Sequence, residues 1–423
     1  MKKKTISLLG CGTVGRGLVE LIQKNRALIA ERSGVELTIS RILVRDLKKD
    51  RPGVDRALLT TRAEEVIGNG ADVVVEVIGG LEPARSLIAQ AIEAGKNVVT
   101  ANKALLAASG SELFRAAAAR GVRIGFEASV CGGIPIVRAL SSGLVGNRIE
   151  RICGIVNGTC NYILTRMTEE KLSFADALAE AQAKGFAEAD PTLDVDGIDA
   201  AQKLEILAEL AFGLQLEPGR VKVEGIRGVG PEDIRAAETL GYVIKHVAVA
   251  ADLGDELDLR VHPALLPVAH PLAHVRHEYN AVQIRGDAVG EMIFHGKGAG
   301  AAPTASAVLS DIIELVRDGA GPVHLPEPLS KPVNADIESE YYLRFPILDV
   351  PGVIGLITTA LGNRGISISH ASATLVKGDP KRGNVQILAH RCRESALQRS
   401  VDEIARLPVL AGKPVVLRIL GEE

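Results

Sequence analysis

The sequence predicts an α/β protein of two or three domains, the first of which is a doubly wound parallel sheet. Its 423 residues exceed the roughly 250–300 that one hydrophobic core can serve, so the chain should divide. Short apolar strands alternate with longer helical patterns over residues 1–134, as in successive βαβ units. The formal net charge of -3 gives no basic field, which argues against nucleic acid or a membrane surface and favours a small metabolite.

The elements expected in this first half follow from apolar runs and from the turn residues that bound them. Continuous apolar stretches such as VVVEVI are typical of parallel strands that are buried on both faces. We expect a helix over residues 18–30, and strands over residues 5–10, 37–44, 72–79, 97–100 and 122–127.

A glycine motif stands between the first strand and the first helix. In that position, glycines let a pyrophosphate approach backbone N–H groups at a helix N-terminus. The motif predicts a dinucleotide-binding Rossmann domain over residues 1–134, completed by residues near 300–320; the alternative is a purely structural turn. The candidate ligands are Gly10, Gly12, Thr13, Val14 and Gly15.

The end of the second strand bears on the choice of cofactor, because an acidic side chain there holds a ribose 2′-OH and a basic one accommodates a 2′-phosphate. Arg45 and Asp46 are adjacent, and Lys48, Lys49 and Arg51 follow. The basic excess favours NADP, with Arg45 as the candidate ligand, but leaves NAD open. A solvated charged loop is the alternative.

Residues 135–300 mix strands with amphipathic helices and read as an α+β domain. Its acidic segment crowds five carboxylates, which disfavours folding unless a cation such as the ammonium of an amino acid is bound. Asp199 and Lys203 are four residues apart and share a helical face. They could be a surface pair, or Lys203 could exchange a proton during hydride transfer. The carboxylates are Glu188, Asp190, Asp194, Asp196 and Asp199.

The run AQAKGFAEADPTLDVDGIDAAQK over residues 181–203 resembles the signature of the homoserine dehydrogenase family. Further matches are TANK at 100–103, EASVCGGIP at 127–135, GIVNGT at 154–159 and GAG at 298–300, so the resemblance spans about residues 1–320. It implies an NAD(P)-dependent enzyme that interconverts L-aspartate 4-semialdehyde and L-homoserine, on the route to threonine, methionine and isoleucine.

The resemblance also implies roles for single residues. Lys203 and Lys103 would be catalytic and converge beside the nicotinamide, with Asp199 orienting Lys203 and the substrate. Glu188 would bind the substrate ammonium, supported by Asp194. Gly158, Thr159 and Tyr162 would line the substrate pocket, and Thr100, Lys103, Gly185 and Gly300 would contact the cofactor.

A sodium site is implied as well. The family's ligands correspond to Glu127 and to the backbone carbonyls of Val130, Gly132 and Ile134, and such oxygens suit a hard cation. Without the resemblance, this segment reads as a Gly/Pro turn between domains.

The last part of the chain predicts a further domain. Residues 321–340 are proline-rich, as in a linker. Residues 341–423 then show a βαββαβ order with a turn at 349–352, which resembles the ferredoxin-like ACT domains that sense amino acids. The resemblance implies feedback by an effector such as L-threonine; a ligand-free dimerisation domain is the alternative. Residues 135–300 would then bind substrate and form the interface of a homodimer or homotetramer.

The cysteines and the apolar stretches bear on location. Five cysteines without disulfide or zinc spacing suit a reducing compartment, and no apolar stretch reaches the ~20 residues of a membrane span, so we expect a cytoplasmic protein.

Two rival functions stay open at this point. One is a phosphorylating semialdehyde dehydrogenase that uses Cys131 as the nucleophile. The other is a non-catalytic sensor built from the Rossmann and ACT domains.

Overall fold

The computed structural model describes residues 1–214, 216, 219–318, 331–376 and 378–421. By their contacts the residues divide into two compact units, and strand β7 (Ile149–Ile155) passes from the first into the second. The first unit is Met1–Ile152, Asp199–Val221 and Tyr279–Lys331, and the second is Cys153–Ile198, Lys222–Glu278 and Pro332–Glu423.

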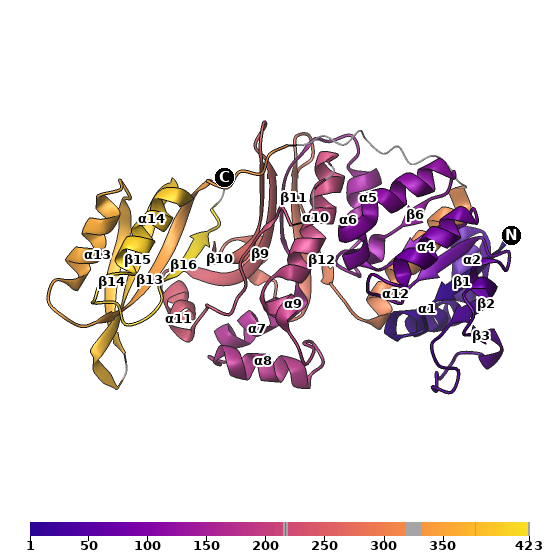
Figure 1. Ribbon diagram of the computed structural model, residues 1–423, viewed down its shortest axis with the longest axis horizontal. Coiled ribbons are helices and arrows are strands. Elements are labelled where there is room, and N and C mark those ends of the chain that lie inside the picture. Colours follow the sequence, from indigo (N-terminus) through magenta and orange to yellow (C-terminus); the bar gives the residue numbers. More distant parts are fainter. Residues whose placement is uncertain (215, 217–218, 319–330, 377, 422–423) are drawn as a thin grey trace. The chain divides into compact units, whose positions relative to one another are not determined.

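A six-stranded parallel sheet organises the first unit (Figure 1), which confirms the predicted doubly wound domain. Its strand order is β3-β2-β1-β4-β5-β6, so the chain starts in the middle, builds one half outward, and then returns to build the other half. The strands are β1 (Lys2–Leu9), β2 (Val35–Leu43), β3 (Leu59–Thr60), β4 (Val73–Glu76), β5 (Asn97–Thr100) and β6 (Ile124–Gly125).

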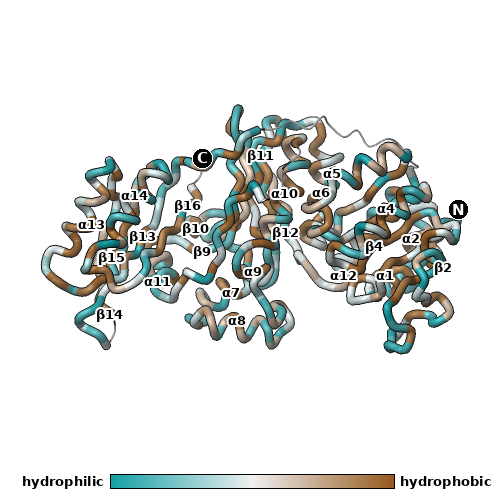
Figure 2. The backbone as a smooth tube through the Cα atoms, viewed as in Figure 1, coloured by the Kyte–Doolittle hydropathy of each residue, from teal (hydrophilic) through white to brown (hydrophobic). Residues whose placement is uncertain are grey.

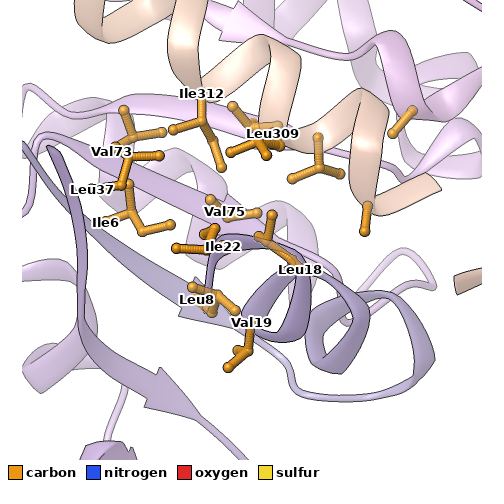
Figure 3. Packing of buried hydrophobic residues seen from close by; sticks show 14 of the residues in the cluster. Ile6, Leu8, Leu18, Val19, Ile22, Leu37, Val73, Val75, Leu309 and Ile312 are labelled. Carbon is orange, nitrogen blue, oxygen red and sulfur yellow. The ribbon is translucent and has the colours of Figure 1, made fainter. Parts of the chain in front are cut away.

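Helices cover both faces of this sheet because its strands are apolar on both sides. Ile6 and Leu8 of β1 pack with α1 (Thr13–Lys24) and α12 (Ala301–Asp318), as Figure 3 shows. Leu9, on the opposite face of β1, packs with α4 (Ala84–Glu93) and α5 (Lys103–Ala119). The apolar colour of β4 in Figure 2 reflects the same burial on both faces.

Three predicted elements of this unit are wrong in their extent. The strand expected over residues 72–79 is only β4, because after Glu76 the chain turns and the N–H groups of Ile78 and Gly79 bond back to the Glu76 side chain. The single helix expected over residues 18–30 is broken at Asn25, where φ is -105° and ψ is 17°, into α1 and α2 (Arg26–Ser33). The apolar face that α1 buries is missing from α2, none of whose residues is buried, so nothing holds the second half in line with the first. The strand expected over 122–127 is only β6, because the chain turns into a 3-10 helix, η2 (Glu127–Ser129).

Most of the rest of the first unit comes from later parts of the chain. Helix α10 (Ile198–Phe212) carries the predicted Asp199 and Lys203, and β11 (Tyr279–Gly286) forms an antiparallel hairpin with β12 (Gly290–Lys297). The other short elements are η1 (Arg56–Leu58), α3 (Glu64–Ile67), α6 (Ile136–Arg138) and the π-helix η3 (Ala139–Gly143).

The second unit contains the antiparallel strands β9 (Tyr242–Asp252) and β10 (Leu257–Pro267). Its core gathers buried apolar residues of helices α7, α8 and α11 with residues of these strands. The remaining elements are α7 (Gly158–Glu169), α8 (Phe174–Ala183), α9 (Thr192–Val195), β8 (Lys222–Val223), α11 (Pro231–Thr239) and η4 (Pro271–His274).

The C-terminal part of the second unit has the predicted βαββαβ element order. Its antiparallel strands lie in the order β16-β13-β15-β14, and β16 also pairs in parallel with β10. Of the predicted linker, residues 321–330 lie outside the described residues, and Pro332 and Asn334 bond to Leu257 at the start of β10. The elements are β13 (Glu338–Leu348), the largely apolar α13 (Val353–Gly362) (Figure 2), β14 (Ile368–Val376), β15 (Asp379–Arg393), α14 (Glu394–Ile404) and β16 (Val415–Ile419).

Across the described ranges, no helix combines the length and the apolar content that crossing a bilayer requires.

Candidate active site

The glycine loop joins β1 to α1 at the carboxyl end of the parallel sheet. Gly10 has a φ of +107°, and a Cβ there would lie 2.9 Å from the carbonyl oxygen of Val77, so only glycine fits. Gly15 packs as tightly, since its Cβ would lie 2.7 Å from the carbonyl oxygen of Gly10. A Cβ on Gly12, the N-cap of α1, would meet nothing within 4 Å, and no side chain caps the helix there. The loop thus leaves open the approach that a phosphate needs.

The basic segment after β2 is exposed at Arg45 and Asp46. Arg51 folds back instead, and its guanidinium donates to the carbonyl oxygens of Asp46 and Lys49 at 2.9 Å. Burial raises the pKa of the Cys11 thiol in the glycine loop, and the positive charge of Arg51 opposes that rise. The segment therefore presents positive charge both at its exposed tip and beside the loop.

Lys103 and Lys203 meet at the carboxylate of Asp199. The Nζ of Lys103, the first residue of α5, lies 3.0 Å from Oδ1, and the Nζ of Lys203 lies 2.7 Å from Oδ2. Asp199 is buried; burial alone would raise the pKa of its carboxyl, but the ammonium groups of Lys203 and Lys103 outweigh this and hold the pKa well below its ordinary value. The ionised carboxylate of Asp199 thus holds together the ammonium groups of Lys103 and Lys203, both of which can donate a proton.

Cys131 lies near this lysine pair but is fully enclosed. Its side chain is buried and its Sγ lies 3.6 Å from Nδ2 of Asn280. Burial raises the pKa of the thiol, although the positive charge of Lys203 opposes the rise. A buried thiol with a raised pKa is unsuited to nucleophilic attack, which disfavours the rival that relies on Cys131.

The segment predicted to bind sodium forms a tight turn. Both oxygens of the buried Glu127 carboxylate accept backbone N–H groups, from Val137 and Arg138 at 2.9 Å. The backbone is left-handed at Cys131 and Gly132, with φ of 53° and 36°. The Gly132 turn packs so closely on the carbonyl of Gly298 that a Cβ would lie 2.6 Å from its oxygen.

Six of the predicted site residues lie in the second unit. Thr159 donates from Oγ1 to the carbonyl oxygen of Phe186 at 2.7 Å, and Gly158 begins α7. The hydroxyl of Tyr162 donates to Glu180 at 2.8 Å and accepts from Lys184 at 2.9 Å, so side chains of the α8 region hold it. The other three are Gly185, Glu188 and Asp194.

The acidic segment of this unit is held through both its backbone and its carboxylates; Asp196, for example, pairs with Arg227. Gln182 donates to the carbonyl of Glu188 at 3.0 Å, and the Glu188 side chain is exposed. Asp194 accepts from Nδ2 of Asn157 at 2.8 Å, while Oδ1 of Asn157 caps α7 by accepting from Cys160. Asn157 thereby links the acidic segment to the start of α7, a link that the sequence analysis missed because Asp194 is 37 residues away along the chain.

Glu76 is a second residue that the sequence analysis missed. This carboxylate ends β4, is wholly buried, and accepts a hydrogen bond from the hydroxyl of Thr100 at 2.6 Å. A glutamate that interrupts the run VVVEVI just before two glycines was the available signal.

A dinucleotide loop in the same unit as a lysine pair able to exchange protons defines the class, an NAD(P)-dependent oxidoreductase. The family model described as "Homoserine dehydrogenase, NAD binding domain" matches residues 10–127, and the model "Homoserine dehydrogenase" matches residues 135–313. The chain belongs to the homoserine dehydrogenase family, whose members act on a CH-OH group.

Several known relatives match nearly the whole chain, and one matches about three quarters of it. The homoserine dehydrogenase of Bacillus subtilis (strain 168) is 40% identical, covering 100% of this chain and 99% of the relative, and that of Synechocystis sp. is 43% identical, covering 98% and 99%. The crystal structure of a homoserine dehydrogenase from Thiobacillus denitrificans has a TM-score of 0.92 at 41% identity, covering 99% of both chains. A hyperthermophilic archaeal homoserine dehydrogenase in complex with NADPH has a TM-score of 0.65 at 31% identity, covering 76% of this chain and 100% of that one.

Proposed function

We propose that this chain catalyses the reversible NAD(P)H-dependent reduction of L-aspartate 4-semialdehyde to L-homoserine in the biosynthesis of threonine, methionine and isoleucine. The observation that carries the proposal is the junction of Lys103 and Lys203 at Asp199. Reduction of an aldehyde creates an alkoxide that needs both a proton and a positive charge nearby, and this junction offers both.

A nicotinamide held by the glycine loop would supply the hydride for the aldehyde carbon, and its oxidised form would accept the hydride in the reverse direction. Lys203 or Lys103 donates a proton to the developing alkoxide, and the other ammonium group stabilises its charge. Asp199 holds the two ammonium groups in position, since it pairs with both. In homoserine oxidation, the same lysine accepts the hydroxyl proton.

The substrate would be held by the second unit. Glu188 is assigned to the substrate ammonium, and its exposed carboxylate supports this role. Asp194 supports it from the neighbouring turn, oriented by Asn157. Gly158, Thr159 and Tyr162 are assigned to the pocket lining.

The cofactor would be held by the glycine loop. The open approach at Gly12 supports a pyrophosphate bound by backbone N–H groups of residues 10–15. Arg45 would accommodate a 2′-phosphate, which favours NADP over NAD, and its exposed position supports this. The remaining assigned contacts are Thr100, Lys103, Gly185 and Gly300.

A structural sodium ion is assigned to Glu127 and to the carbonyls of Val130, Gly132 and Ile134. Each Glu127 oxygen accepts a backbone N–H bond, and a carboxylate oxygen has a second lone pair that a hard cation can use. The donor set therefore fits the ion.

Residues 341–423 are assigned as an ACT regulatory domain, with L-threonine as the candidate effector, in a cytoplasmic homodimer or homotetramer. The βαββαβ order and the φ of +87° at Gly352, the N-cap of α13, support this assignment. Neither family model extends past residue 313, so the two models do not describe the last part of the chain.

The deciding experiment is a spectrophotometric assay of homoserine oxidation with NAD and NADP side by side, with and without L-threonine. Lys203→Ala should abolish turnover and leave NADPH binding intact, whereas Lys413→Ala, which removes an exposed lysine, should change neither. Near wild-type turnover in Lys203→Ala would refute the role of Lys203. An equal response to both cofactors would refute the NADP preference.

A further inference from the structure

Glu76 is a buried carboxylate at the carboxyl end of β4. Its relative exposure is 0%, and its three donors are two backbone N–H groups and one hydroxyl. Oε1 accepts from the backbone N–H groups of Ile78 at 2.8 Å and Gly79 at 2.9 Å, and Oε2 accepts from Thr100 at 2.6 Å. Burying a charge is costly unless hydrogen bonds compensate it, so this carboxylate has a reason to be there beyond ending a strand.

The hydroxyl of Thr100 connects Glu76 to the start of α5. Thr100 ends β5 in register with Glu76, and its Oγ1 accepts from the backbone N–H of Asn102 at 3.1 Å. Asn102 is the N-cap of α5; its Oδ1 accepts from the backbone N–H of Leu105 at 3.1 Å. The next residue is Lys103, whose Nζ lies 3.0 Å from Asp199.

A second contact closes the same network. Nδ2 of Asn102 donates to the carbonyl oxygen of Gly80 at 2.6 Å, in the loop whose N–H groups bond to Glu76. Gly79 and Gly80 have positive φ values of 79° and 74°. Because glycine adopts many backbone conformations, the conformation of this loop depends on its hydrogen bonds. The two oxygens of Glu76 thus hold the loop with one and the start of α5 with the other.

We propose that Glu76 is a positioning residue for hydride transfer, because it holds the N-terminus of α5 where Lys103 pairs with Asp199. The proposal rests on the proposed catalytic role of Lys103. A carboxylate suits this task, since both of its oxygens accept and both segments donate to it. An amide has one acceptor oxygen, and its NH₂ group could meet the Thr100 oxygen only as a donor, which leaves the buried Thr100 hydroxyl proton without this acceptor.

Glu76→Gln is the informative variant. Its Oε1 can still accept from Ile78 and Gly79, but its NH₂ group cannot accept from Thr100. We expect kcat to fall about tenfold, while KM for homoserine and the Kd for NADPH stay within about twofold, as befits the loss of one charge-assisted hydrogen bond. In a Lys103→Met background, measured at high enzyme concentration, the same substitution should lower kcat no further.

Competitive acetylation of lysines gives a readout that needs no turnover. An ammonium held by a carboxylate reacts poorly, so Lys103 should label several-fold faster in Glu76→Gln, relative to the exposed Lys24 of the same unit. Asp72→Asn is the matched control: Asp72 precedes β4 at its other end and bonds to Lys4 and Thr5. This control should leave the relative labelling of Lys103 unchanged.

Wild-type kcat together with wild-type labelling of Lys103 in Glu76→Gln would overturn the proposal. So would an equal rise of Lys103 labelling in Asp72→Asn, because that would reveal general loosening of the sheet. If Lys103→Met itself kept wild-type turnover, the proposed role of Lys103 would fail instead, and the labelling would still decide whether Glu76 holds the start of α5.

Discussion

Arg344 and Asp233 form a two-bond ion pair inside the second unit. Nε of Arg344 donates to Oδ1 of Asp233 at 2.6 Å, and Nη2 donates to Oδ2 at 2.9 Å. Asp233 is fully buried near the start of α11, where it also accepts from Gly230, and Arg344 comes from β13. The pair therefore fastens the βαββαβ part of the chain to α11 through a contact 111 residues apart.

Arg344→Ala should lower the stability of the second unit by about 3–5 kcal/mol, because it leaves the charge of Asp233 buried without its partner. Urea unfolding followed by tyrosine fluorescence measures this, since four of the five tyrosines lie in that unit. The control is Arg235→Ala, whose pair with Glu232 is exposed, and it should cost under ~0.5 kcal/mol. Equal, small effects of both substitutions would contradict the importance of the buried pair.

Gly10→Ala and Gly12→Ala should separate folding from cofactor binding. A Cβ at position 10 would meet the carbonyl of Val77 in a left-handed backbone, so this variant should lose about 1–3 kcal/mol of stability and bind NADPH poorly. A Cβ at position 12 meets nothing in the protein, so stability should stay within ~0.5 kcal/mol. Its NADPH affinity should still fall, because the methyl group occupies the approach of the pyrophosphate. Thermal unfolding and NADPH fluorescence titration measure the two effects, and unchanged affinity in Gly12→Ala would place the cofactor elsewhere.

Glu209 should make the first unit less stable as the pH rises from about 4.5 to 7. Burial, and to a smaller extent the charge of Glu205, raise the pKa of the Glu209 carboxyl from 4.5 to about 7. Between these values the folded chain keeps a proton that the unfolded chain has released, so stability is lost as the pH increases. Glu209→Gln should flatten this dependence and be about 2 kcal/mol more stable than the wild type at pH 8.

Urea unfolding by circular dichroism across that pH range is the measurement for Glu209. Glu20→Gln, at an exposed position of α1, should keep the wild-type dependence. If Glu209→Gln keeps it as well, the Glu209 carboxyl does not carry the effect.

Cys131 should resist alkylation in the native protein. Its side chain is 1% exposed and burial raises the pKa of its thiol, so iodoacetamide at pH 7.5 should leave both the residue and homoserine oxidation intact. Mass spectrometry of the native and the denatured protein gives the comparison, with all five cysteines labelled after denaturation. Loss of activity that tracks labelling of Cys131 would revive the thiol-dependent rival.

Local signals carried the parts of the fold that could be predicted. The strand predicted at 97–100 is found as β5 (Asn97–Thr100), because a short apolar run between Gly95 and a polar turn favours a buried strand. The break at Asn25 was missed, since the helical pattern continues through it and the loss of a buried face shows only in three dimensions.

The candidate site likewise contains residues that the sequence could identify and residues that it could not. Glycines directly after a strand indicate a dinucleotide loop by their local spacing, so Gly10 and Gly12 could be proposed as cofactor ligands from the sequence alone. The contact of both lysines with Asp199 could not be predicted from local spacing. Lys203 is four residues away and could be paired with Asp199 by helical spacing, but Lys103 is almost a hundred positions earlier. Only the resemblance to a known family linked the two lysines. Glu76 had only the local signal of a glutamate within an apolar run, and nothing in the sequence pointed to its partner Thr100, which is 24 residues away.

Helix α12 has a consequence for how the protein is made. The core beneath the first sheet takes Ala305, Val308, Ile312 and Leu315 from this helix, although the six strands are complete by Gly125. A ribosome adding 5–20 residues per second needs roughly 10 to 40 s to travel from the end of the sheet to the end of the helix. During that interval α1 alone covers part of this face of the nascent sheet, so chaperones can bind the apolar residues that α12 covers later.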